Sequence, residues 1–83
     1  MQYHATIFQG GRAVLTDVPV DIQETPNSWE GSFRLPPGTL MLHGPTQVEL
    51  DDGRRGECQI TTYPFPGAHV NPVVRFVGKG PLR

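Results

Sequence analysis

The residues of this chain best suited to binding chemistry are arginines. Two of them, Arg54 and Arg55, follow Asp52-Gly53 directly in the stretch LDDGRRGEC. The arginine side chain carries a planar, permanently charged fork of N–H donors that matches a phosphate or a carboxylate. If the fold brings four arginines together, they form a candidate anion-binding site: Arg34, Arg54, Arg55 and Arg75. The alternative is a solvated face on which neighbouring glutamates neutralise them.

The sequence gives less support to a metal site or a catalytic site than to an anion-binding site. The histidines, His4, His43 and His69, are too far apart in sequence to match a short metal-ligand spacing. Cys58 is the only cysteine, so neither an internal disulfide nor a CxxC zinc framework is possible. Its position in an alternating run places it inward, where a thiol acts as a small core hydrophobe. We therefore expect no metal site, no cofactor and no enzyme.

Two glycine-rich stretches, FQGGR and VGKGPLR, invite comparison with phosphate-binding loops. Neither matches GxGxxG or GxxxxGK[ST], and neither precedes a segment that can form a helix. The first is predicted as a hairpin turn. The second is predicted as the end of the domain, with a barrel over residues 1–78 and a C-terminal tail over residues 79–83.

Length and charge narrow the class of protein. A chain of 83 residues makes one domain, and seven Lys+Arg against eight Asp+Glu give a net charge of -1. This balance argues against a general nucleic-acid binder, which carries a strong basic excess. No apolar run reaches the length of a membrane span of roughly 18 residues, and the N-terminus does not resemble a signal peptide. A lone cysteine suits a reducing compartment, so we expect a cytoplasmic protein.

The distribution of glycine and proline indicates an all-β fold. Ten glycines and nine prolines are scattered so that no segment free of both is longer than residues 1–9. An average helix needs about 11 to 12 residues, and a proline inside one costs roughly 3 kcal/mol. Apolar residues alternate instead, which predicts six strands: 2–9, 12–22, 28–35, 39–51, 54–63 and 73–78.

Each predicted strand has an inward face. In the second strand Val14, Thr16 and Val18 share the inward parity, and in the fifth Cys58, Ile60 and Thr62 do so. In the third strand Glu30, Ser32 and Arg34 point outward. The fourth strand contains Gly44-Pro45, read as a kink within one long strand, with two shorter strands as the alternative. Residues 64–72 are predicted as a loop.

A meander of six short strands gives a closed barrel or a two-sheet sandwich. We favour a small antiparallel barrel of the SH3-like or OB-like size class, because the chain is short for two full sheets and a barrel removes exposed strand edges.

Strand parity also predicts the geometry of two turns. A two-residue Gly10-Gly11 turn pairs Gln9 with Arg12 and, in unbroken register, Ile7 with Val14. A two-residue turn at Asp52-Gly53 would set apolar residues opposite charged ones. A three-residue loop over residues 51–53, with Gly53 at positive φ, instead pairs Val48 with Gly56 and Thr46 with Cys58.

Apolar residues with outward parity indicate an interface. The candidates are Phe8, Leu15, Met41, Phe65 and Phe76. For the last strand, Val73 and Val77 are the alternative outward pair. A cluster of such residues on a surface marks a binding site, and self-association is its simplest use. The sequence thus predicts a non-enzymatic interaction module that binds itself or another protein. The alternative is a weak anion, nucleotide or RNA binder that uses the surface arginines.

Overall fold

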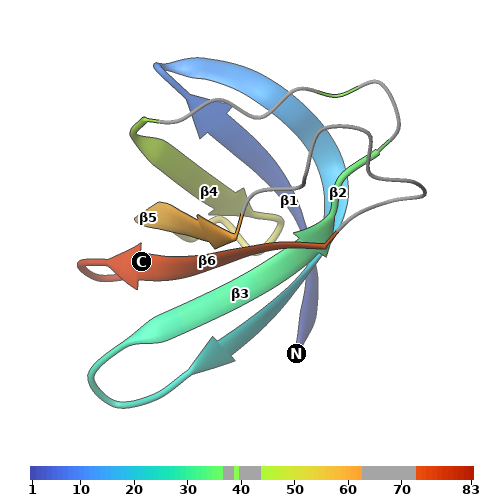
Figure 1. Ribbon diagram of the computed structural model, residues 1–83. Coiled ribbons are helices and arrows are strands. Elements are labelled where there is room, and N and C mark those ends of the chain that lie inside the picture. Colours follow the sequence, from blue (N-terminus) through green and yellow to red (C-terminus); the bar gives the residue numbers. More distant parts are fainter. Residues whose placement is uncertain (37–38, 40–43, 63–72) are drawn as a thin grey trace.

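The protein is a closed antiparallel β-barrel (Figure 1). The computed structural model describes residues 1–36, 39, 44–62 and 73–83. Its strands are β1 (Gln2–Gln9), β2 (Arg12–Glu24), β3 (Trp29–Arg34), β4 (Thr46–Leu50), β5 (Arg55–Thr62) and β6 (Val73–Lys79). The predicted small all-β barrel is confirmed. Over the described ranges, no helix is long and apolar enough to cross a membrane.

The order of the strands differs from a simple meander. Around the barrel it is β1-β2-β3-β6-β5-β4, so β3 pairs with β6 and β1 pairs with β4 (Figure 1). The spatial sequence β4-β1-β2-β3 is that of a Greek key. The expected meander is therefore correct within each half of the chain and wrong at the junction. Alternation reports which side chains face inward, but not which strand lies beside which.

The second hairpin has the predicted three-residue loop. Gly53 has a φ of 94°, and its N–H donates to the carbonyl oxygen of Leu50 at 2.9 Å. Val48 pairs with Gly56, and Thr46 pairs with Cys58. The inward positions of Cys58 and Ile60 are also confirmed.

Thr62 is exposed, whereas its parity predicts an inward position. A register shift in the β5–β6 pairing between Ile60 and Thr62 accounts for this difference.

The first hairpin departs from its predicted register. Gln9 pairs with Arg12 as expected, but Ile7 pairs with Leu15 rather than Val14, and Ala5 pairs with Val18. The extra residues in β2 form bulges, and Asp17 has a φ of 52° there.

These bulges reverse the parity of β2 over a short stretch. Leu15 is turned into the core with 8 % of its surface exposed, while Thr16 is exposed. The predictions of an outward Leu15 and an inward Thr16 are therefore wrong.

The fourth strand is shorter than predicted. It begins at Thr46, and neither Thr39 nor Gly44-Pro45 belongs to a strand. Pro45 has no N–H to donate, and Gly44 has a φ of 137°, which residues other than glycine rarely adopt. A single strand running through Gly44-Pro45 is therefore wrong, and residues 40–43 lie outside the described part of the chain.

One end of the barrel is filled by Trp29. Its indole N–H donates to the carbonyl oxygen of Gly80 at 2.9 Å, and its ring meets that of Phe76 edge to face at 6.1 Å. Gly56 and Gly78 leave the space that the indole occupies. The buried residues of the core are Ala5, Ile7, Leu15, Val18, Val20, Ile22, Trp29, Phe33, Leu35, Val48, Leu50, Cys58, Ile60, Val74 and Phe76.

The C-terminal residues pack against the same end of the barrel. Lys79 still belongs to β6, and Gly80 turns the chain with a φ of 90°. Leu82 packs against the core, and Arg83 exchanges two backbone hydrogen bonds of 3.0 Å with Arg55. The segment predicted as a tail is thus docked on the first residue of β5.

Candidate functional site

Arg54 links three separate parts of the barrel. Its guanidinium donates to Glu24 at 2.7 Å, to Asp52 at 2.9 Å and to the hydroxyl of Tyr3 at 3.0 Å. The hydrogen bond with the Asp52 side chain raises the pKa of Arg54, and the backbone N–H of Arg54 lowers the pKa of the Asp52 carboxyl. Two carboxylates share this one positive charge, so Arg54 links segments on the barrel surface and offers little attraction to an external anion.

Arg55 is neutralised in a different place. It forms a salt bridge of 3.1 Å with Glu49 of β4, and its guanidinium lies 5.0 Å from the centre of the Phe8 ring. This cation–π contact covers part of Phe8, which is half-buried. Adjacent in sequence, Arg54 and Arg55 therefore point to different partners and do not act as one clamp.

The other two candidate arginines lie on a common face. Arg34 and Arg75 are exposed on the outer side of β3 and β6, and neither makes an ion pair with any described residue. Arg34 is the last residue of β3. Arg54 directly precedes β5 and lies next to the end of β2. The four predicted arginines therefore do not converge on one anion site.

The predicted apolar interface is also dispersed. Leu15 and Phe76 belong to the core, and Phe76 is only 2 % exposed. The reason is Gly31, which pairs with Phe76 and leaves its ring the space that a Cβ would take, 2.6 Å from the ring. Met41 and Phe65 lie outside the described residues. On β6 the alternative pair faces outward: Val73 and Val77 are 39 % and 37 % exposed.

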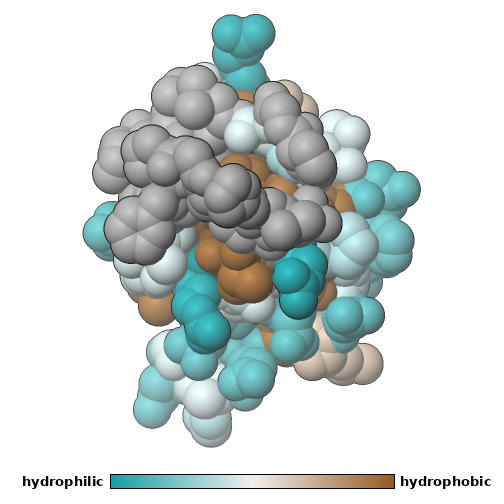
Figure 2. Space-filling view, turned by 45° about the vertical axis from the view of Figure 1, so that its right-hand side comes forward, coloured by the Kyte–Doolittle hydropathy of each residue, from teal (hydrophilic) through white to brown (hydrophobic). Residues whose placement is uncertain are grey.

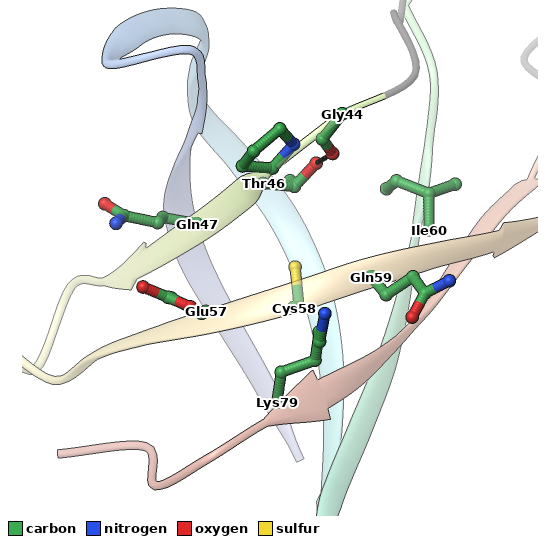
Figure 3. Close-up of a pocket in the computed structure, with 9 residues that line it drawn as sticks. Gly44, Thr46, Gln47, Glu57, Cys58, Gln59, Ile60 and Lys79 are labelled. Carbon is green, nitrogen blue, oxygen red and sulfur yellow. Dashed lines mark hydrogen bonds between the residues drawn. The ribbon is translucent and has the colours of Figure 1, made fainter.

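A hollow in the described surface lies between β4 and β5 (Figure 3). It has a volume of about 460 Å³, and Gln47, Glu57, Gln59 and Lys79 contribute polar walls. The pairing of the two strands stops at Thr46 and Cys58, because β4 begins only after Gly44-Pro45.

Cys58 borders this hollow, but its chemistry is that of a core residue. Burial raises the pKa of its thiol to about 12, so the group is protonated near neutral pH. Thiols react as thiolates, so Cys58 is not an activated nucleophile. His4, the one histidine within the described ranges, binds Asp17 at 2.9 Å on the exposed surface. No group of three or more metal-ligating side chains occurs within those ranges.

A second surface combines charge, apolar side chains and shape. We name it the β3 face and define it by the outward residues of three neighbouring strands: Pro19, Asp21 and Gln23 of β2, Glu30, Ser32 and Arg34 of β3, and Val73, Arg75 and Val77 of β6. Two shallow hollows of about 190 and 280 Å³ lie on it and share Asp21 and Ser32 as lining residues. Ser32 is small, so the centre of the face is lower than its surroundings.

The β3 face was only partly visible in the sequence. The outward alternation of Glu30, Ser32 and Arg34 identified its central strand, and Arg75 was a candidate residue. Asp21 was not predicted as part of this face, because only the pairing of β3 with β6 places Arg75 across β3 from Asp21. On the side of the molecule shown in Figure 2, apolar surface lies in patches between hydrophilic side chains. Such mixed surfaces are common in non-obligate protein interfaces.

Comparison with known proteins adds no assignment. No protein-family model, curated protein or solved structure matches this chain.

Proposed function

We propose that this barrel is a non-enzymatic interaction module that associates with a second copy of itself. One observation carries the proposal: the β3 face holds two exposed valines beside charged side chains that have no partner within the described ranges. Val73 and Val77 are exposed on β6, where they pair with Arg34 and Glu30 of β3. Arg34, Arg75 and Glu30 surround them without an ion pair.

Charged side chains without partners favour recognition over catalysis. Complementary charges across an interface select the partner and its orientation, while apolar residues contribute affinity. Two residues outside this face could in principle take part in chemistry, but both are occupied within the protein. Cys58 is buried and the pKa of its thiol is raised, and Arg54 forms salt bridges with two carboxylates. These arrangements support a structural role for both side chains.

A weak anion, nucleotide or RNA binder is the alternative function. It requires Arg34, Arg54, Arg55 and Arg75 to act together, and they lie in separate environments. Arg54 and Arg55 are each paired with a carboxylate. No specific observation favours this alternative over self-association.

We further propose that the module works in the cytoplasm. Its single cysteine is free and buried, and the described core relies on no covalent cross-link. Such a protein suits a reducing compartment.

The proposal is tested by the mass of the protein in solution. Sedimentation equilibrium over a wide range of concentration should give an average mass that rises from the 9.2 kDa of the monomer towards twice that value. Added salt should reduce the association, because charge pairs contribute to it. A mass of 9.2 kDa at every concentration, at low salt, would refute self-association.

A further inference from the structure

Four charged residues surround Ser32 on the β3 face. Along β3, Ser32 lies between Glu30 on one side and Arg34 on the other. Across the sheet, Ser32 pairs with Asp21 of β2 and with Arg75 of β6. The two acids therefore occupy two adjacent sides of Ser32, and the two arginines occupy the other two sides.

The spacings of a sheet set the four charged residues at the corners of a rhombus that is longer along β3 than across it. Residues two apart on a strand are separated by about 7 Å, and neighbouring strands by about 4.8 Å. Glu30 is thus a diagonal neighbour of Arg75, and Arg34 is a diagonal neighbour of Asp21. One straight line in the plane of the sheet passes through Ser32 and separates the members of both pairs: it runs between Glu30 and Arg75 on one side of Ser32 and between Arg34 and Asp21 on the other. Val77, which pairs with Glu30, lies on the same line.

We propose that a second copy of this chain docks on the β3 face about a two-fold axis along this line. The rotation places Glu30 opposite Arg75 of the second copy, and Arg34 opposite Asp21 of the second copy. The reciprocal contacts follow from the symmetry. Each end of the axis then holds two acids and two bases in alternation. The proposal rests on the proposed self-association and adds the surface and its geometry.

Other two-fold axes in this face bring like charges together. An axis along β3 places Glu30 opposite itself, and an axis across β3 places Arg75 opposite itself. The diagonal axis avoids both clashes, and it makes the β3 strands of the two copies cross at about 70°. Charge complementarity therefore selects both the occupant and its orientation.

The shape of the face fits this arrangement. Ser32 meets its own equivalent at the axis, where a larger residue would hold the sheets apart. The hollows on both sides of Ser32 can receive side chains of the second copy. Val77, 37 % exposed, meets its equivalent on the axis and supplies an apolar contact. Because exposed charge pairs contribute little each, we expect weak association that depends on salt.

The sharpest test uses the Glu30–Arg75 contact, since Asp21 already lies 3.1 Å from the terminal amino group of Met1. Arg75→Glu sets acids opposite acids, and Glu30→Arg sets bases opposite bases. Each variant alone should bind itself at least about tenfold more weakly than the unmodified protein, since two pairs of like charges replace two pairs of opposite charges. An equimolar mixture of the two variants should associate again, because every facing pair is then opposite in sign.

Arg12→Glu is the matched control, since Arg12 is an exposed arginine in the first hairpin, outside the β3 face. It should leave association unchanged, and circular dichroism should show all three variants folded. If the unmodified protein associates and the variants at positions 30 and 75 associate equally well, this face is refuted while the proposed function stands. A mixture that stays monomeric also refutes the geometry. If the unmodified protein is itself monomeric, the proposed function fails.

Discussion

The indole ring of Trp29 occupies the space that a side chain at Gly78 would need. A Cβ at Gly78 would lie 2.2 Å from Cε2 of Trp29, closer than non-bonded carbon atoms approach. Neither partner can move easily. Gly78 pairs with Cys58 in the β5–β6 ladder, and the Trp29 indole donates to Gly80. The position of the Trp29 indole therefore requires glycine at position 78, at the end of the barrel that the indole fills.

Gly78→Ala should destabilise the protein by about 3 kcal/mol, because an added methyl group in a packed interior forces the ring and strand apart. The free energy of unfolding from urea denaturation measures the loss. In a Trp29→Phe background the same change should cost less, since the smaller ring vacates part of the space. An equal cost in both backgrounds would show that the indole is not the obstacle.

Gly53→Ala should destabilise the barrel by about 1 kcal/mol through backbone strain. Gly53 has a φ of 94°, and no described atom beyond its chain neighbours lies within 4 Å of the place that a Cβ would take, so packing does not contribute. Gly53→Asn should cost less, because asparagine tolerates positive φ better than alanine does. Thermal and urea unfolding of both variants would measure this order, and equal stability of Gly53→Ala and the unmodified protein would contradict it.

Asp52 should make stability depend on pH in the acid range. Its pKa is lowered below the ordinary 3.8, first by the backbone N–H of Arg54 and also by the Arg54 side chain. A carboxyl with a depressed pKa stabilises the folded state above the pKa of the unfolded chain, and this contribution is lost as pH falls through the folded pKa.

Asp52→Asn should therefore lower stability at neutral pH and weaken the further loss below pH 3.8. Unfolding free energies measured at several pH values would show the change in slope. Asp51→Asn is the matched control, because Asp51 is an exposed neighbour on the same loop. The same slope in Asp52→Asn and the unmodified protein would contradict the role of the Asp52 carboxyl.

Cys58 should resist alkylation while the barrel is folded. The residue is 4 % exposed, and burial raises the pKa of its thiol to about 12, so little thiolate forms at mildly alkaline pH. Iodoacetamide should label it slowly in buffer and rapidly in denaturing urea, as followed by mass spectrometry. Rapid labelling of the folded protein would show that the hollow between β4 and β5 admits reagent to the sulfur.

Local alternation in the sequence was sufficient to predict much of the barrel. The inward faces of β1, β3 and β5 follow from period-two patterns such as that of Trp29 and Phe33. The loop over residues 51–53 could be predicted because a three-residue loop, unlike a two-residue loop, keeps Val48 and Cys58 on the same face. In both cases the information lies within one strand or one hairpin.

The bulges of β2 were not predictable in the same way. Val14 and Leu15 are both apolar, so the sequence permits either residue to face inward. The pairing of Ile7 with Leu15 decides between them. Phe76 and Val77 present the same ambiguity, which is resolved by the space that Gly31 leaves across the β3–β6 ladder.

The fold class, most strand positions and the geometry of the tight turns could be predicted from the sequence, because they follow from backbone chemistry and from the alternation of neighbouring residues. The order of the strands around the barrel depends on contacts between distant segments and is seen only in the folded protein. That order placed Arg54 between carboxylates of two different segments and set Arg75 beside Ser32 on the β3 face. A charge acquires its partners from strands distant in sequence, so the candidate site emerged only with the closed barrel.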